Sequence, residues 1–466
     1  YQSLLKNRRQ SLHAAAGRAF ESLYAGRHED VYDRLAYHYS EAGDPEKALL
    51  YLALFAERAA RGYAHAEAAK ALREALAHTE SLPEPRRERT LLDLVLQLAE
   101  SLLPLACFSE TLELFLRYAG TLERLGDPAR AGRYFFWLAH TYSYLGDQEE
   151  AASNARRAVA EAQRAADPAT EGKSLYVLSR DAFWSGRFSE GIEHGRRAVA
   201  LLERSADRWW KGQAYWVAGF HHYVLGQFEE AFGMMEKADA IWKALQDPRL
   251  DPSWSTGYFH ASLGDWELGI AECKGGLERA RDPLNTAAAL GFLGYAYLEK
   301  GDLQEAIEAL AESVERLRQA GMLQLFGWFS AFLAEARLRA GGPAAESREL
   351  ARHALAVTEA SGFRYGSGLA QRALGRVAHA AGERSEAEIR LGEALESFRT
   401  IEAPFEVGRT LLDLALLAHS GGDPGEAAQR LGEAYRLFTE LRVPQYVEKT
   451  ERLADGLAVS LVPAAP

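Results

Sequence analysis

Few residues in this sequence stand at spacings that could support catalysis or tight ligand binding. Gly172, Lys173 and Ser174 match the end of a phosphate-binding loop. That loop requires a glycine five residues before Gly172, and the residue at that position is Asp167. No strand is predicted before it, so the backbone cannot form the phosphate cradle. The sequence therefore does not predict nucleotide binding.

Metal ligation is not predicted either. His221 and His222 are neighbours on a predicted helix, so their side chains diverge by about 100°. We expect His222 to be a core histidine rather than a metal ligand. Cys107 and Cys273 are the only cysteines, too few for a cysteine zinc site and too far apart in the repeat register for an expected disulfide. The prediction is a protein without a catalytic residue, metal or cofactor, and not an enzyme.

The composition excludes several other classes. The chain has 466 residues, of which 48% are hydrophobic and 26% charged, and a formal net charge of −12. This balance argues against general binding of nucleic acid or an anionic membrane. No run is long and apolar enough to span a membrane, and no signal peptide opens the chain, so we expect a cytoplasmic location. Because the sequence begins at Tyr1, we expect it to be a piece of a longer protein.

A helical repeat must position any functional residue of this chain, and its pattern is clearest in Leu290–Val314. Leu290, Leu293, Gly294 and Tyr297 recur at helical spacing and predict one buried stripe. The segment predicts two helices joined at Gly301, a left-handed residue that ends the first helix. Asp302 and Glu305 could then cap the second helix. The same turn glycine recurs in steps of 37 to 41 residues, at Gly146, Gly186, Gly226, Gly264, Gly301, Gly342, Gly382 and Gly422.

Small residues follow every one of these glycines at two fixed offsets. Such residues let two helices approach closely, and composition alone does not explain a small residue in every position. Five positions after the glycines are Ala151, Gly191, Ala231, Gly269, Ala306, Ser347, Ala387 and Ala427. Twelve positions after them are Ala158, Ala198, Ala238, Gly276, Ser313, Ala354, Ala394 and Ala434.

The spacing also predicts how the chain is divided. Residues 1–30 are expected to be connector helices, which either packed against an upstream domain or cap the array. Residues 31–128 should hold degenerate helical repeats, with two helices between Asp33 and His78 and a break or kink near Pro104. Residues 129–455 form the regular array and 456–466 a tail. Several repeats are separated by Asp-Pro pairs suited to starting a helix, at 167–168, 247–248 and 282–283.

The pattern of leucine, small residue, tyrosine, Gly-Asp and alanine resembles the tetratricopeptide repeat. Leu293, Gly294, Tyr297, Gly301 and Ala306 carry it most fully. The period of about 40 is longer than the usual 34, as the second helix is longer. This form resembles the C-terminal arrays of bacterial signal-transduction ATPases, and the opening of the chain resembles the junction in nucleotide-cyclase/ATPase/repeat proteins. The resemblance implies an all-α, right-handed solenoid of helix-turn-helix repeats.

The resemblance also implies which offsets face the concave side of the solenoid. Aromatic residues recur there between residues 133 and 300, together with a few polar ones. They suit an extended peptide or a flat small molecule, held by stacking and cation–π contacts. The alternative is that neighbouring helices use the same rings to pack on one another. The predicted strip comprises Phe136, His140, Lys173, Tyr176, Arg180, Phe183, Gln213, Trp216, Phe220, Tyr223, Trp254, Tyr258 and Tyr295.

Three functions follow as hypotheses. The first is a module that recognises a protein or peptide on its concave face and signals to an attached ATPase or cyclase. The second is a small-molecule sensor whose inducer binds at the aromatic strip, near Trp216 and Trp254. The third is the regulatory part of an enzyme whose chemistry lies wholly outside these residues, with its own upstream ATPase domain as the partner.

Overall fold

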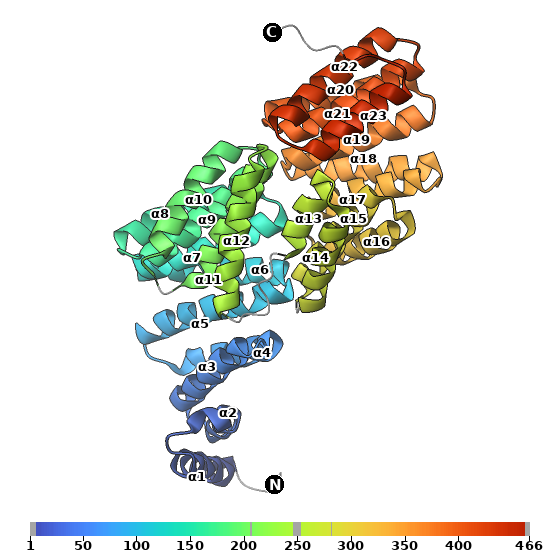
Figure 1. The fold of residues 1–466 in the computed structure, drawn as a ribbon. Helices are drawn as coiled ribbons and strands as arrows, with labels where there is room; N and C mark the ends of the chain where they lie inside the picture. Colours follow the sequence, from blue (N-terminus) through green and yellow to red (C-terminus); the bar gives the residue numbers. More distant parts are fainter. Residues whose placement is uncertain (1–5, 206, 246–252, 281, 462–466) are drawn as a thin grey trace. The chain divides into compact units, whose positions relative to one another are not determined.

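The computed structural model describes residues 6–205, 207–245, 253–280 and 282–461. Within these residues every regular element is a helix and none is a strand (Figure 1). Successive helices pair as hairpins, for example α9 with α10, α15 with α16 and α19 with α20. The predicted all-α fold of helix-turn-helix repeats is therefore confirmed. The chain divides into two compact units, one holding residues up to Thr141 together with Ala160–Ala166, the other Tyr142–Val159 and the residues from Asp167 on.

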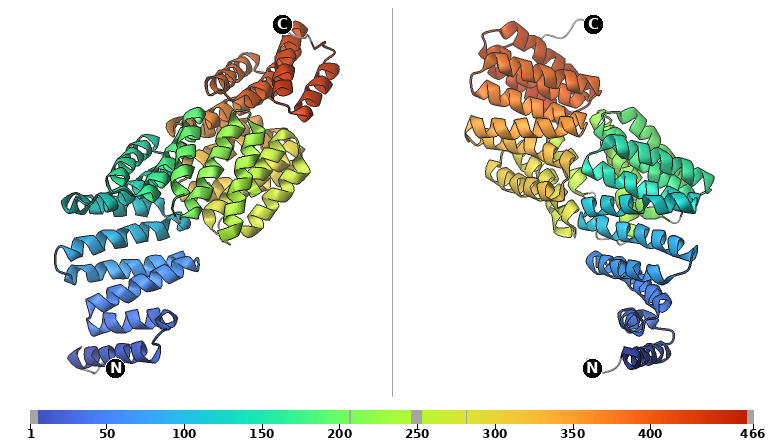
Figure 2. Two further views of the ribbon diagram at one scale, coloured as in Figure 1. Left: turned by 60° about the vertical axis from the view of Figure 1, so that its left-hand side comes forward. Right: turned by 180° about the vertical axis from the view of Figure 1, so that it is seen from behind.

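The first unit is a run of helices that follow one another in chain order, drawn in blue in Figure 2. The sequence predicted two helices between Asp33 and His78, and this is wrong, because a turn at Gly62–Ala64 divides the second into α3 and α4. Tyr63 adopts φ +62° there, which a sequence pattern does not signal for tyrosine. Near Pro104 the chain forms a short 3-10 helix, Leu103–Leu105. The α-helices are α1 (Lys6–Leu23), α2 (Tyr32–Ala42), α3 (Pro45–Arg61), α4 (His65–His78), α5 (Arg86–Leu102), α6 (Phe108–Leu125) and the greater part of α7 (Pro128–Leu145).

The second unit contains the regular hairpins, and α8 (Gln148–Arg164) is shared between the units. Its last helix begins at Pro444, as predicted. The Asp-Pro pair at 247–248 and residues 1–5 and 462–466 lie outside the described residues, and the predicted four-way division of the chain stays a prediction. The helices are α9 (Pro168–Trp184), α10 (Phe188–Leu202), α11 (Arg208–Val224), α12 (Phe228–Leu245), α13 (Ser253–Leu263), α14 (Trp266–Arg279), α15 (Pro283–Lys300), α16 (Leu303–Ala320), α17 (Leu323–Arg339), α18 (Ala344–Ala360), α19 (Arg364–Ala380), α20 (Arg384–Thr400), α21 (Pro404–Ser420), α22 (Pro424–Glu440) and α23 (Pro444–Gly456).

The turn glycines have the predicted conformation, with one exception. Gly301 closes α15 at φ +100°, in the left-handed region that costs glycine nothing. In the repeat assigned to Gly342, the left-handed residue is Gly341, at φ +79°, so the register of that turn was predicted one residue too late. The predicted cap at Asp302 is also wrong, because its side chain accepts no capping hydrogen bond. Asp167 and Asp282, by contrast, do cap α9 and α15.

The small residues lie where two helices nearly touch. All sixteen residues at the two offsets are buried. In the hairpin of α15 and α16, a Cβ on Gly294 would lie 2.6 Å from Leu310 Cγ, and Ser313 Oγ donates a hydrogen bond of 2.6 Å to the Ala287 carbonyl. The close approach of paired helices through small side chains, as the repeat predicts, is confirmed.

Within the second unit, later hairpins pack directly against the turns of earlier ones. The turn at Gly146 touches Ser361, the turn at Gly186 touches Ile401, and the turn at Gly226 touches Leu441. The two residues of each pair are 215 positions apart in the chain. A Cβ at Gly186 would lie 2.7 Å from Ile401 Cγ2, which leaves no room for a side chain. The regular period therefore brings equivalent surfaces together several repeats apart and closes this unit on itself.

Candidate binding surfaces

The thirteen residues of the predicted binding strip are mostly buried. Phe136 and His140 belong to the first unit, where their rings lie 5.8 Å apart, and the other eleven belong to the second. Lys173, Gln213 and Trp216 are half-buried. The remaining eight are buried: Tyr176, Arg180, Phe183, Phe220, Tyr223, Trp254, Tyr258 and Tyr295.

The structure brings the rings of the second unit together in the order of the repeats. The ring centroids of Phe183 and Phe220 are 5.7 Å apart, and those of Phe220 and Tyr258 are 6.4 Å apart. Tyr258 in turn lies 5.0 Å from Tyr295. The inward offsets taken from the resemblance thus place these residues in one contiguous aromatic strip.

Side chains from later helices cover this strip. Trp328 of α17 lies 5.7 Å from the ring of Tyr258, and Phe363 lies 6.2 Å from that of Phe183. Tyr258 is 1% exposed as a result. This packing agrees with the alternative given by the sequence, in which the rings pack helices against one another. Ligand binding by the strip stays a prediction.

Only one margin of the strip reaches the surface. Trp216 Nε1 donates a hydrogen bond of 2.8 Å to Ser255 Oγ, and its ring lies 5.7 Å from Trp254. Lys173 pairs with Asp207 at 2.5 Å, and its ammonium lies 5.8 Å from the ring of Trp210.

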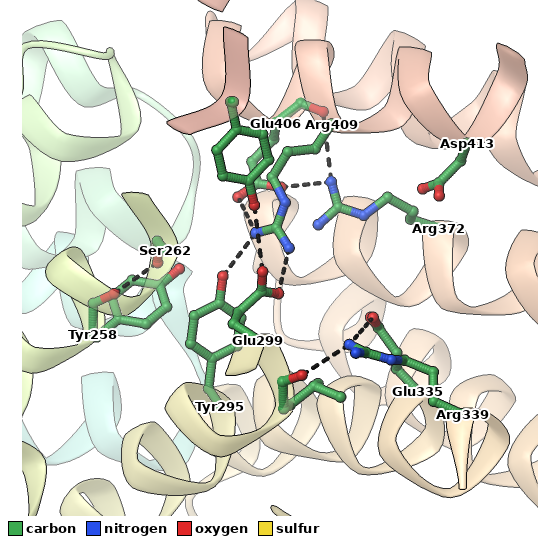
Figure 3. A network of polar contacts seen from close by, with 12 residues as sticks. Tyr258, Ser262, Tyr295, Glu299, Glu335, Arg339, Arg372, Glu406, Arg409 and Asp413 are labelled. Atoms are coloured by element: carbon green, nitrogen blue, oxygen red, sulfur yellow. Dashed lines mark hydrogen bonds and ion pairs between the residues drawn. The ribbon is translucent and has the colours of Figure 1, made fainter. Parts of the chain in front are cut away.

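Beyond the aromatic strip, the inner face changes to a buried polar network (Figure 3). Arg409 extends from α21 to α15, where it donates hydrogen bonds to the Tyr295 hydroxyl at 2.7 Å and to Glu299 Oε1 at 2.5 Å. Arg372 pairs with Glu406 at 2.5 Å, and both side chains are 3% exposed. The two hydrogen bonds of Arg409 join residues 114 and 110 positions apart, so they hold a later helix against an earlier one.

Tyrosines and a second ion cluster extend the network. The Tyr365 hydroxyl donates to Glu406 at 3.0 Å and lies 3.1 Å from that of Tyr258. This places the end of the aromatic strip in direct contact with the charges. In the second cluster, Arg376 pairs with Glu335 at 2.5 Å and with Asp413 at 2.9 Å.

The buried carboxylates stay ionised because of their partners. Burial alone would raise the pKa of Glu299, but the neighbouring Arg409 and Lys449 outweigh it and hold the pKa at about 2. Burial likewise raises the pKa of Glu406, but Arg372 and Arg409 lower it by more, so the pKa lies below its usual value. A carboxylate held in this way suits a fixed tie between helices, and it does not suit proton transfer near neutral pH.

The sequence signalled this network only in part. Arg372 and Arg376 stand at the inward offsets of their repeat, where earlier repeats carry Tyr176 and Arg180. Their acidic partners gave no signal, because Glu299, Glu335 and Glu406 lie among many Glu residues that pair at the surface. A search for acidic residues at inward positions of the first helix of each hairpin, together with the inward arginines, could have indicated the ion pairs.

An open groove of about 510 Å³ lies beside the turn of α11 and α12. Its lining is partly apolar and partly charged: Arg399 pairs with Glu433 at 2.7 Å, and Glu402 is exposed. Its volume falls within the range of ordinary ligand sites. The lining residues are Ser189, Leu225, Gln227, Phe398, Arg399, Glu402, Ala403, Pro404, Val407, Glu433 and Leu437.

The motif residues rejected from the sequence have structural roles. Gly172 and Ser174 lie inside α9, and Ser174 Oγ donates to the Thr170 carbonyl at 2.7 Å. The expectation for His222 is wrong: it is half-buried and contacts Gln227, whereas His221 is the core histidine. His221 Nε2 lies 2.9 Å from the Ser179 carbonyl, and burial lowers the pKa of this imidazole to about 3.

No group of three or more His, Cys, Asp or Glu in the described part of the chain is placed to hold a metal ion. Both cysteines are free thiols. Across the same residues, no helix combines the length and apolar character needed to cross a membrane.

Comparison with known proteins gives weak structural similarities. No family model matches the chain, and no curated protein sequence matches it. A solved Rap protein in complex with the competence and sporulation factor is similar at 13% identity and a TM-score of 0.41, over 79% of this chain and 98% of that one. The Cut9–Hcn1 hetero-tetramer of the APC/C is similar at 15% identity and a TM-score of 0.38, over 95% of this chain and 93% of that one.

Proposed function

We propose that this chain is a non-catalytic scaffold of helical repeats that binds a protein or peptide partner. The observation that carries the proposal is the open groove of the second unit. Among its lining residues, the half-buried Leu225, Pro404 and Leu437 supply apolar surface, and Arg399, Glu402 and Glu433 are charged. Apolar surface next to charged side chains suits a protein-binding site. The inner aromatic strip, by contrast, is covered by the protein's own helices.

The charges of the groove specify the partner further. Arg399 and Glu433 neutralise each other, while Glu402 adds an exposed acid. A peptide that places an apolar side chain on the apolar lining and a basic side chain beside Glu402 would satisfy both features. The proposed partner is therefore a peptide segment with a lysine or arginine next to a large apolar residue.

A peptide selection tests this proposal. Peptides selected from a displayed library on the wild-type protein should carry that pattern, and their affinity is measured by fluorescence anisotropy. Glu402→Lys should weaken binding about ten-fold through charge reversal, and Ser189→Trp should block the groove. Glu396→Lys makes the same charge change at an exposed position of α20 that does not line the groove, and it should have no effect. Equal binding to wild type and Ser189→Trp would refute the proposal.

The half-buried margin of the aromatic strip supports a second candidate, a small-molecule sensor. Trp216 offers ring surface to solvent, with Lys173 and Gln213 at neighbouring inward positions. A flat molecule could stack on the exposed part of the Trp216 ring. With the first candidate, the protein- or peptide-binding scaffold, we also propose attachment to a bacterial ATPase or cyclase and a cytoplasmic location, which the resemblance and the sequence suggested. A P-loop in the gene upstream of Tyr1 would support that architecture.

A further inference from the structure

The first helix of the first unit buries only one of its sides. A Cβ on Gly17 would lie 2.8 Å from the ring of Tyr39, so α1 is in close contact with α2. Glu21 reaches across to α3, where it accepts hydrogen bonds from Lys47 at 2.9 Å and from the Tyr51 hydroxyl at 2.7 Å. These contacts fix the rotation of α1 and therefore also fix which side faces outward.

The outward flank of α1 is an apolar stripe. Leu12 is 53% exposed and Leu23 is 76% exposed. Between them Ala15 and Ala19 are exposed and Ala16 is half-buried. The spacings follow the helical period, so the stripe, defined as Leu12, Ala15, Ala16, Ala19 and Leu23, runs straight along about three turns.

The charges beside the stripe are of one sign. Lys6, Arg8 and Arg18 are exposed on α1. The only acid of this helix, Glu21, is directed inward to Lys47. The exposed charges of this helix are therefore all cations, and Arg8 and Arg18 stand one helical turn from Leu12 and Ala15 of the stripe.

The last helix of the array has the opposite character. On α23 the exposed residues include Glu448, Lys449, Glu451, Arg452 and Asp455. A polar outer face of mixed sign is what a terminal repeat requires to end a stack in water. α1 also exposes polar residues, but its exposed charges are all positive and Leu12 and Leu23 are exposed among them, which favours an interface over a cap.

We infer that this stripe is a docking surface for an amphipathic helix with acidic flanks on a partner protein. A helix continues the stacking by which α2 already covers the other side of α1. The three alanines allow two helix axes to approach to about 8–10 Å, with Leu12 and Leu23 packing at the ends of the contact. Acidic side chains on the partner would pair with Arg8 and Arg18. The inference involves only the first unit and does not depend on the groove.

The probe is a synthetic helical peptide of the length of α1, with a leucine and alanine stripe flanked by glutamates, titrated with the full chain. Saturable binding that weakens with added salt is expected. Leu12→Asp should weaken it at least about ten-fold, because a charge then replaces an apolar anchor. Ile389→Asp is the matched control, since Ile389 on α20 is 54% exposed. Unchanged circular dichroism of Leu12→Asp verifies that α1 still folds.

Several outcomes would overturn the inference. A peptide with lysines in place of the glutamates that binds equally well would remove the role of charge. Absence of saturable binding, or binding unaffected by Leu12→Asp, would remove the docking surface. Binding of wild type, but not Leu12→Asp, to vesicles of anionic lipid would identify a membrane as the occupant. Self-association in sedimentation that Leu12→Asp abolishes would identify a second copy of the chain.

Discussion

Two stretches of the inner face of the second unit share one repeat geometry and differ in chemistry. From α9 to α15 the buried inner face consists mainly of rings such as Tyr176 and Tyr258, and from α19 on it includes the buried ion pairs of Arg372 and Arg409. Both stretches are buried by contacts with helices far away in the sequence. The hairpin register therefore fixes which positions face inward, and the side chains there decide how distant hairpins are held together.

The two kinds of contact should respond differently to perturbation. Ring packing is stabilised by burial and dispersion and depends little on pH. Buried ion pairs recover the cost of desolvation only while both partners are present and charged. Variants in the two stretches can therefore separate the contributions of the aromatic and the charged contacts.

Loss of a buried guanidinium should have the largest effect. Arg409→Ala leaves Glu299 buried without its guanidinium partner, while Glu406 keeps Arg372, and we expect a loss of about 3–5 kcal/mol in the free energy of unfolding. Denaturant titration measures this loss. Arg316→Ala removes an exposed ion pair with Glu312 and should cost less than about 1 kcal/mol. Similar midpoints for the two variants would contradict the assigned network.

Truncation of Trp328, whose ring covers the strip, should lower the free energy of unfolding by a similar amount. The cause is lost packing and not the loss of an ion pair. Trp328→Ala removes a side chain that contacts both Phe183 and Tyr258, and about 3–5 kcal/mol should be lost. The loss should be the same at pH 7 and pH 4, because no neighbouring charge changes. A pH-dependent loss would show that the aromatic and charged stretches cannot be treated separately.

Acid should weaken the charged stretch selectively. The pKa of Glu299 is about 2 in the folded protein against 4.5 ordinarily, so the unfolded state binds the proton first as the pH falls. The stabilisation is fully present above about pH 4.5 and is lost towards pH 2, and it amounts to about 3 kcal/mol. Stability curves of wild type and Glu299→Gln should differ in slope over that range. Parallel curves would contradict the depressed pKa.

The parts of this structure that sequence could predict are those set by local spacing. The small residues at fixed offsets, such as Ala306 and Ser313, predicted which faces of paired helices touch. The cover over the aromatic strip could not be predicted in this way. It depends on the small rotation between successive repeats, summed over several of them, and no single residue encodes that sum. For the same reason the partners of Arg409 appear only when the later helices are in place.

Inserting bulk into a hairpin should have an intermediate effect. Ala306 is fully buried where α15 and α16 meet, so Ala306→Leu should cost about 1–3 kcal/mol. The matched control is Ala309→Leu, a half-buried position on the same helix. The thermal midpoint measures both. Equal midpoints would show that the two helices can separate without cost, against the observed close approach.

The smallest effect is expected where the aromatic strip reaches the surface. Trp216 is half-buried and donates one hydrogen bond, so Trp216→Ala should cost roughly 1 kcal/mol, far less than Trp328→Ala. The same variant distinguishes packing from ligand binding. A metabolite that binds the strip at 100 times its dissociation constant would stabilise wild type by about 2.7 kcal/mol in a thermal-shift screen. Trp216→Ala should abolish that shift, and Tyr215→Ala, at the adjacent half-buried position, should retain it. If Trp216→Ala retains the shift, the molecule binds elsewhere, and the strip serves only to hold the helices together.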